Sequence, residues 1–312
     1  MSLIAELKPE QSVKGNYLCK YKQMLKNKNG KDYCTIRLQD KTGVVDGKIW
    51  SIHAGIEACE VDDVVYIEGE TLLYQDNMQL NINKLTKAEV GTYELKEFIP
   101  HTRKDVDTLE TELFEFIEHI QNPFIKKVLE AIFYDEQIYN MFSMNGAAKT
   151  VHHAYLNGLL EHTVGVAKIG EKLASLYEIA NKDLVIAGCL LHDLGKIYEL
   201  SAFPKNDYTD EGQLLGHIMI GIEKINDKIR EIPDFPYEEG ILLKHIVLAH
   251  HGEYEYASPK RPKCIEAIIV HLADHSDSKL KMMEEMIIAS NDEEIYAGYH
   301  KILNRNIRKS QL

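Results

Sequence analysis

The hydrophobic pattern changes period once along the 312-residue chain, near residue 107, and this change restricts the fold more than any other feature. Up to about residue 88, short segments rich in β-branched and aromatic residues alternate with turn signals, which is typical of strands. After residue 107, apolar residues recur three and four positions apart, as in LETELFEFIEHIQ, which is typical of helices. The sequence therefore predicts a β domain over 1–90, a linker over 91–106 and an all-α domain over 107–312.

The β domain is predicted to be an OB-fold barrel. NKNG, DKTG and DN mark turns between strands, and SIHAGIEACE (51–60) has helical character between the third and fourth strands. Three strands, a short helix and two strands are the order of an OB-fold, although other small barrels share the strand count. LQDKTGVVDGKIW (38–50) resembles the second hairpin of nucleic-acid-binding OB domains. The predicted strands are 12–25, 32–40, 43–50, 63–74 and 78–85.

Positive charge is concentrated in the predicted barrel. The whole chain has a formal charge of −13, but residues 14–48 contain nine Lys and Arg against three Asp, a local balance of +6. OB grooves stack bases on aromatic rings while lysines follow the phosphate backbone. The alternative is that the rings fill the barrel and the lysines are solvated. The candidates for contact with single-stranded nucleic acid are Lys26, Lys28, Lys31, Tyr33 and Trp50.

The apolar run LVIAGCLL (184–191) ends in two adjacent polar residues, His192 and Asp193. Buried polar groups are costly unless they are paired or bound to a metal. Four further apolar segments of the helical half carry histidines, and imidazoles with carboxylates on several helices are what a metal site in a bundle requires. One such histidine is usually a satisfied core residue, but five segments are poorly explained in that way. The further histidines are His152, His153, His162, His217, His245, His250, His251, His271 and His275.

The order of these residues resembles the HD-domain superfamily of metal-dependent phosphohydrolases. The matching motifs LLEHT, LLHDLGK and LADHSD lie within 147–280. The resemblance implies that one residue of the first motif, two of the second and one of the third hold a divalent metal. These four residues are His162, His192, Asp193 and Asp274.

Three more histidines match those of HD proteins that hold a second metal: His217, His250 and His251. Adjacent helical residues point about 100° apart, so His250 and His251 can face one site only where a helix ends or bends. Gly252 favours a helix end there. Which of the two is a ligand stays open.

The expected cofactor is one or two divalent ions. Such ions neutralise phosphate oxygens and activate water for attack on a phosphodiester. Mixed imidazole and carboxylate ligands suit Mn, Fe, Co or Zn better than Mg²⁺. The resemblance implies Mn²⁺, with Mg²⁺, Co²⁺, Fe and Zn as alternatives.

Several cationic residues near the predicted ligands are candidates for substrate contact. Lys196 follows Asp193 by one turn and is predicted to be catalytic with it, unless it is a surface lysine at a helix end. The resemblance alone implies that Lys149 and His153 bind substrate phosphate. Lys260 and Arg261, in SPKRPK, either hold a nucleic-acid strand or belong to a solvated turn.

From about residue 12 to about 300, the chain resembles the YhaM-type 3′–5′ exoribonucleases, on HHAYLNGLLEHT, HDLGKIYEL and AHHGEYEYASPKRP. This implies hydrolysis of single-stranded RNA, and of single-stranded DNA as a second substrate, to nucleoside monophosphates through metal-activated water. One alternative is an HD enzyme acting on small nucleotides, a dNTPase or cyclic-nucleotide phosphodiesterase with a regulatory barrel. The other is a non-catalytic, replication-related protein that binds single-stranded DNA.

Composition adds expectations about location and assembly. The five cysteines are scattered without a CxxC pair, which favours a reducing cytoplasm over a disulfide framework. No apolar run reaches the roughly 18–20 residues of a membrane helix, and no signal-peptide pattern is present, so no membrane partner is expected. The acidic segment 282–303 is predicted to be helical and could carry the contact of a homo-oligomer, and NRNIRKSQL is predicted to be a frayed end.

Overall fold

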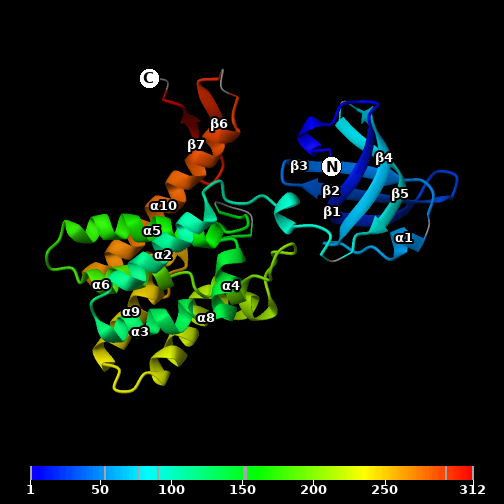
Figure 1. The fold of residues 1–312 in the computed structure, drawn as a ribbon. Coiled ribbons are helices and arrows are strands. Elements are labelled where there is room, and N and C mark those ends of the chain that lie inside the picture. Colours follow the sequence, from blue (N-terminus) through cyan, green and yellow to red (C-terminus); the bar gives the residue numbers. More distant parts are fainter. Residues whose placement is uncertain are drawn as a thin grey trace. The chain divides into compact units, whose positions relative to one another are not determined.

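The computed structural model describes residues 2–52, 54–75, 77–89, 91–149, 153–291 and 294–310. The chain divides into two units, Met1–His101 and Thr102–Leu312 (Figure 1). Each unit has its own hydrophobic core. The division falls inside the predicted linker, residues 91–106.

The first unit is a closed five-stranded barrel with the order β1-β2-β3-β5-β4. A parallel pairing of β3 with β5 closes it, and the short helix α1 precedes β4. This is the OB topology, so the predicted fold of the β domain is confirmed. The elements are η1 (Ile4–Glu6), β1 (Ser12–Lys26), β2 (Asp32–Asp40), β3 (Gly43–Ile49), α1 (Ala54–Glu57), β4 (Val64–Tyr74), β5 (Asn77–Lys87) and η2 (Leu95–Glu97).

Local irregularities let these strands curve into a barrel. The pairing of β1 with β2 shifts register between Cys19 and Tyr21, and the same strand pairs with β4 along its first half. The pairing of β4 with β5 shifts register between Glu68 and Gly69. A Cβ atom at Gly69 would lie 2.5 Å from the backbone oxygen of Asn81, so only glycine allows this close approach.

The second unit is a helical bundle whose central helix is α6, confirming the predicted all-α domain. Residues Leu184–Leu191 of α6 are all buried, because the run offers no polar side chain to solvent. The helices α5, α9 and α10 pack against it. No helix in the described ranges is both long and apolar enough to cross a membrane. The helices are α2 (Val106–His119), α3 (Pro123–Phe133), α4 (Glu136–Met144), α5 (Gly158–Ser175), α6 (Lys182–Leu191), α7 (Lys196–Glu199), α8 (Asp210–Glu231), α9 (Tyr237–Ala249), η3 (Tyr254–Tyr256) and α10 (Ile265–Ala289).

Polar caps set where several of these helices begin. Asn122 accepts hydrogen bonds from two backbone amides of α3, and Pro123 follows it as the first helical residue. Asp135 caps α4 in the same way, and Asn181 accepts from the amide of Leu184 in α6. These side chains satisfy amides that have no partner within their own helix.

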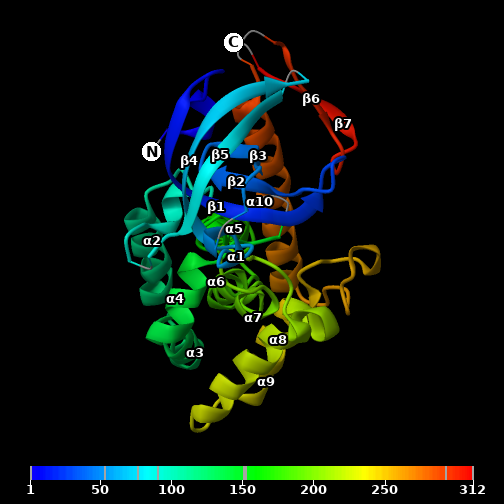
Figure 2. The same ribbon diagram turned by 90° about the vertical axis from the view of Figure 1, so that its right-hand side faces the viewer.

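The C-terminal region corrects two expectations. The predicted helix over 282–303 ends at Ala289, and it is followed by a hairpin of β6 (Tyr296–His300) and β7 (Arg305–Arg308), seen at one end of α10 in Figure 2. The tail is not frayed through its described part, because Ile307 is buried against α10. Residues 311–312 of that predicted end lie outside the described residues.

Candidate metal centre

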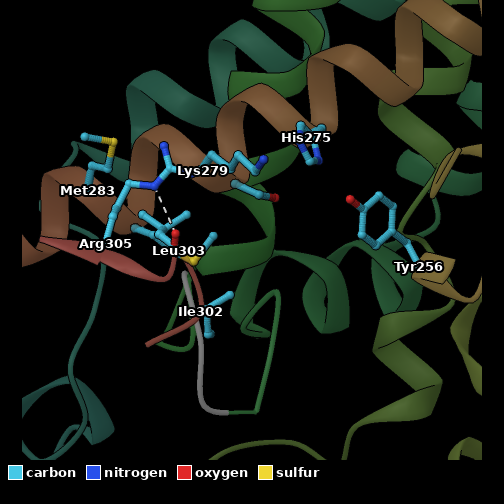
Figure 3. A pocket seen from close by; sticks show the side chains of 9 residues that line it. Tyr256, His275, Lys279, Met283, Ile302, Leu303 and Arg305 are labelled. Carbon is cyan, nitrogen blue, oxygen red and sulfur yellow. Dashed lines mark hydrogen bonds between the residues drawn. The ribbon is translucent and has the colours of Figure 1, made fainter. Parts of the chain in front are cut away.

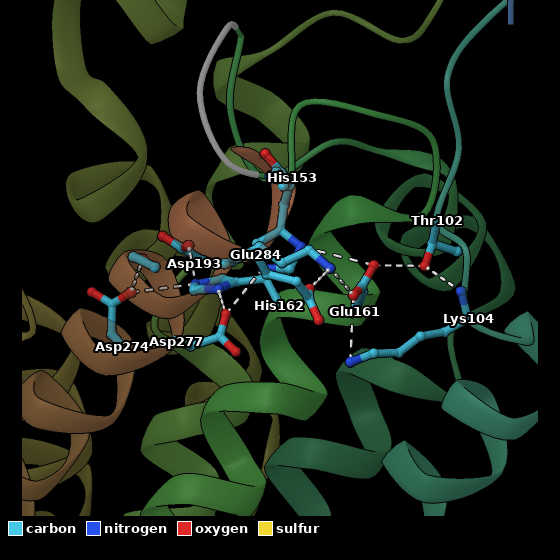
Figure 4. Close-up of polar contacts among 12 residues, drawn as sticks. Thr102, Lys104, His153, Glu161, His162, Asp193, Asp274, Asp277 and Glu284 are labelled. Carbon is cyan, nitrogen blue, oxygen red and sulfur yellow. Dashed lines mark hydrogen bonds and ion pairs between the residues drawn. The ribbon is translucent and has the colours of Figure 1, made fainter. Parts of the chain in front are cut away.

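Three helices bring the four residues of the HD pattern together. His162 lies on α5, His192 and Asp193 follow the last residue of α6, and Asp274 lies on α10. Nε2 of His162 is 3.1 Å from Nε2 of His192, 3.4 Å from Oδ2 of Asp193 and 3.3 Å from Oδ1 of Asp274 (Figure 4). His162, His192 and Asp193 are each at most 3% exposed. We call these four residues the HD cluster.

A second group, the histidine cluster, consists of His217, His250 and His251. One nitrogen from each lies within 4.8 Å of the others. His217 follows a break in α8 at Gly216, where φ is +71°. The helix α9 ends at Ala249, so His250 and His251 leave it where the chain bends and both face the same point. The predicted helix end before Gly252 is therefore present.

Asp193 faces both clusters. Its Oδ2 atom lies 3.4 Å from Nε2 of His162 and 3.3 Å from Nε2 of His192. Its Oδ1 atom lies 3.5 Å from Nε2 of His217 and 3.8 Å from Nε2 of His250. One carboxylate thus offers an oxygen to each group of imidazoles, as a residue shared by two cations would.

The histidines are oriented as metal ligands. In all five, Nδ1 lies next to an oxygen that holds the proton on that nitrogen, so the lone pair of Nε2 points inward. Nε2 of His217 and of His250 is buried and has no hydrogen-bond partner in the described part of the chain. Leaving such atoms unsatisfied costs about 1–3 kcal/mol each, and a divalent cation would satisfy them. The Nδ1 partners are Asp277 Oδ2 for His162 (2.8 Å), Cys189 O for His192 (2.8 Å), Glu199 Oε1 for His217 (3.1 Å), Val247 O for His250 (2.7 Å) and Tyr256 O for His251 (2.9 Å).

The electrostatics of Asp193 and His250 favour the forms that bind a cation, whereas Asp193, Asp274 and Asp277 raise the pKa of His162 well above its usual value, so a cation would have to displace a proton there. Burial alone would raise the pKa of Asp193, but Lys196 and His192 hold it well below its usual range. Burial lowers the pKa of His250 well below its usual value. The carboxylate is therefore charged and His250 is neutral near pH 7, and these are the forms that bind metals.

The short helix α7 contacts residues of both clusters. Lys196 places Nζ 2.6 Å from Oδ2 of Asp193 and is largely buried, so it pairs with a ligand instead of extending into solvent. A Cβ atom at Gly195 would lie 1.9 Å from the backbone oxygen of His217, so glycine is required where α7 meets α8. Glu199 accepts hydrogen bonds from the amide of His217 and, at 3.1 Å, from its Nδ1.

Two supporting carboxylates were not singled out in the sequence. Asp277 accepts a hydrogen bond from Nδ1 of His162, and Glu199 does so from His217. Asp277 could have been found from its spacing, because it follows Asp274 by three residues and both therefore lie on one face of α10. Nothing in the sequence around Glu199 marks it as a partner of His217.

The two residues expected to bind substrate phosphate, Lys149 and His153, lie in different environments. His153 is 1% exposed, with Nε2 3.0 Å from Oδ2 of Asp277 and Nδ1 3.1 Å from the hydroxyl of Tyr155. It therefore supports Asp277 from inside the protein and does not reach a substrate. Lys149 is half exposed and pairs with Asp207 at 2.6 Å.

The basic loop lies between the histidine cluster and α10. Arg261 donates a hydrogen bond from Nε to Glu253 at 2.7 Å, and its guanidinium carbon lies 5.0 Å from the ring centre of Tyr254. Lys260 is exposed. The positive charge of this loop is thus partly compensated by Glu253.

On the barrel, three aromatic rings and a lysine of β2, the end of β3 and the end of β4 lie close together. Tyr33 stacks on Trp50 with ring centres 5.0 Å apart, and Trp50 is 44% exposed. Nζ of Lys48 lies 5.6 Å from the ring centre of Trp50 and 4.9 Å from that of Tyr74. Tyr17, by contrast, is fully buried in the barrel core. We call Tyr33, Lys48, Trp50 and Tyr74 the barrel face.

The remaining predicted lysines belong to the hairpin between β1 and β2. Lys26, Lys28 and Lys31 are all exposed. No carboxylate of the described residues lies within ion-pair distance of them in the structure. This hairpin is one of the loops through which OB-folds contact oligonucleotides.

A His, His-Asp and Asp set collected by separate helices defines an HD-domain protein with a divalent-metal site, here joined to an OB-fold. Residues 159–279 match the HD domain family. The 3′–5′ exoribonuclease YhaM of Shouchella clausii is 35% identical over 89% of this chain and 86% of its own length. The 3′–5′ exoribonuclease YhaM of a Geobacillus strain is 33% identical over 90% of this chain and 86% of its own length. The chain belongs to the YhaM family of 3′–5′ exoribonucleases, which confirms the resemblance seen in the sequence.

Among solved structures, the second OB-fold domain of replication protein A from Methanococcus maripaludis matches part of the chain. The match covers 30% of this chain and 98% of that domain, with 21% identity and a TM-score of 0.24.

Proposed function

We propose that this protein is a metal-dependent 3′–5′ exoribonuclease that releases nucleoside monophosphates from single-stranded RNA. The observation that carries the proposal is the position of Asp193, with one oxygen facing the HD cluster and the other facing the histidine cluster. Membership of the YhaM family supports the direction of attack and the polymeric substrate.

The HD cluster and the histidine cluster would each hold one divalent cation, with Asp193 between them. Bound cations would neutralise the phosphate oxygens and supply activated water. Mn²⁺ fits a set of five imidazoles and two carboxylates better than Mg²⁺, which prefers oxygen ligands. Lys196 balances part of the negative charge of Asp193, and under this proposal its ammonium group would also contact a phosphate oxygen.

The barrel face would hold the RNA strand. Trp50 and Tyr74 offer exposed rings on which bases could stack, Tyr33 is partly exposed and stacks on Trp50, and Lys48 lies beside Trp50 and Tyr74. The lysines of the β1–β2 hairpin would contact phosphates, and Lys260 and Arg261 would do so near the metal centre. Stacking does not require a 2′-hydroxyl, so single-stranded DNA is a second substrate under this proposal.

The substitution Asp193→Ala tests the proposal. It removes the carboxylate shared by the two clusters, so we expect hydrolysis to fall at least about 100-fold while RNA binding by the barrel is kept. The assay follows a 5′-labelled RNA in Mn²⁺, where the wild-type protein should give a descending ladder of labelled products. Near-normal hydrolysis by Asp193→Ala, or products that indicate attack from the 5′ end, would contradict the proposal.

A further inference from the structure

A cavity lies along α10 beside the metal centre and contributes no ligand to either cluster (Figure 3). Its volume is about 400 Å³, near the lower end of the range for sites that hold one small ligand. Its walls come from η3, α10 and the C-terminal hairpin. We call it the α10 groove, defined by Tyr256, Lys279, Met283, Ile302, Leu303 and Arg305.

The α10 groove adjoins the metal centre through shared lining residues. A smaller cavity of about 180 Å³ is lined by the ligand residues His251 and Asp274. Tyr256, His275 and Ser278 line both cavities. A substrate with one phosphate at the metal centre can therefore extend into the groove.

The charge of the groove suits a phosphate. Lys279 and Arg305 are exposed, and neither lies within ion-pair distance of a carboxylate among the described residues. Nε of Arg305 donates to the backbone oxygen of Leu303 at 2.9 Å, which leaves its terminal amino groups available. No acidic residue is among the described residues that line the groove, although the whole chain carries −13. Lys279 follows Asp274 by five residues, about 7.5 Å along the helix axis.

Apart from Lys279, Arg305, His275 and Ser278, the residues that line the groove are apolar or aromatic. Met283 and Leu303 form one side, and Ile302 is 60% exposed in the turn of the hairpin. The ring of Tyr256 is 57% exposed and faces the groove across from α10 (Figure 3). Flat, partly apolar rings such as nucleobases bind to surfaces of this kind.

We propose that the α10 groove binds the penultimate nucleotide of the RNA, on the 5′ side of the scissile phosphate. The phosphate 5′ to that nucleotide contacts Lys279 and Arg305, and its base lies against Ile302 and Tyr256. The 3′-terminal nucleotide contributes only the scissile phosphate, which lies at the metal centre, so a second phosphate can come only from the 5′ side. This inference rests on the proposed exoribonuclease function.

The test compares two short RNAs that carry the same 2′-O-methyl ribose near the 3′ end. In one of them, the phosphate 5′ to the penultimate nucleotide is an uncharged methylphosphonate. With the wild-type protein, we expect kcat/KM to fall at least tenfold on the neutral RNA. We expect Lys279→Met to lower kcat/KM at least tenfold on the normal RNA. In this variant, the neutral RNA should lower kcat/KM by no more than a further twofold.

Lys172→Met is the matched control, because Lys172 is an exposed cation on α5 that does not line the groove. It should keep the wild-type rate and the full penalty for the neutral phosphate. Additive losses for Lys279→Met and the neutral phosphate, or a normal rate for Lys279→Met, would overturn the inference. The proposed function fails in a different way, namely if the wild-type protein releases no monophosphates from either RNA.

A separate experiment tests where the penultimate base lies. Ile302→Ser changes an exposed turn residue, so folding is not at stake. We expect it to lower kcat/KM on normal RNA and to remove most of the penalty of an abasic penultimate nucleotide. A penalty that is as large in Ile302→Ser as in the wild-type protein would contradict the placement of the base.

Discussion

At the scale of single residues, the metal centre depends on which nitrogen of each histidine faces inward. His162, His192, Asp193 and Asp274 could be predicted from sequence, because their order and local motifs repeat a known pattern. Asp277 could not be assigned, because its role depends on which helix face meets Nδ1 of His162. The phosphate contact that the resemblance implied for His153 could not be judged from sequence either, since the chain before α5 turns this buried residue toward Asp277.

The support of His162 by Asp277 can be measured directly. Asp277→Asn removes the charge that holds the proton on Nδ1 of His162, so we expect affinity for Mn²⁺ to fall about 10–100-fold. Calorimetric titration of the protein with Mn²⁺ gives this affinity. Ser276→Ala is the control, because within the described ranges the Ser276 hydroxyl bonds only to the backbone oxygen of Leu272 on its own helix. Equal affinities in the two variants would show that Asp277 does not support the site.

At the scale of elements, the site is built where helices end or break. His192 and His250 are the residues after α6 and α9, and His217 follows the break at Gly216. Helix periodicity and Gly252 predicted the helix end at His250 and His251. The break in α8 has no sequence signal beyond Gly216 itself. The C-terminal hairpin was missed because its stability comes from packing of Leu303 and Ile307 on α10, not from local pattern.

Gly195 tests the contact between α7 and α8. Gly195→Ala would place a Cβ atom 1.9 Å from the backbone oxygen of His217, so α8 must shift and the histidine cluster with it. We expect a loss of stability of about 1–3 kcal/mol in urea unfolding and a fall in hydrolysis of at least about tenfold.

Gly240→Ala is the control for this experiment. A Cβ atom there would have its nearest neighbour at 3.4 Å, an ordinary contact, and alanine favours the helical conformation of α9. We expect equal or slightly higher stability and normal hydrolysis. If both variants behave alike, close packing at Gly195 does not position His217.

At the scale of the whole molecule, the chain consists of two units with separate cores. The change of hydrophobic period predicted this organisation, because strands and helices bury their apolar residues at different spacings. The helical unit holds every residue of both clusters, and the barrel holds the barrel face. Under the proposal, the helical unit would hold the 3′ end of the RNA at the metal centre, and the barrel would add stacking contacts with the rest of the strand.

Removal of residues 1–101 separates these roles. We expect the remaining chain to hydrolyse a dinucleotide at nearly the full rate, while KM for a long single-stranded RNA rises at least about tenfold because the stacking rings are lost. Initial rates on both substrates measure this. Turnover of mononucleotides alone, with or without the barrel, would favour a nucleotide phosphohydrolase instead.

The shared carboxylate of Asp193 also determines how the centre fills. Its two oxygens carry a single negative charge between them, so under the proposed two-cation arrangement the first cation to bind would draw on the charge that both use. The second cation would then meet a like charge and a partly neutralised ligand. We therefore expect stepwise binding, with a tight step followed by a weaker one, so that the concentration of free metal would set how many molecules hold both ions.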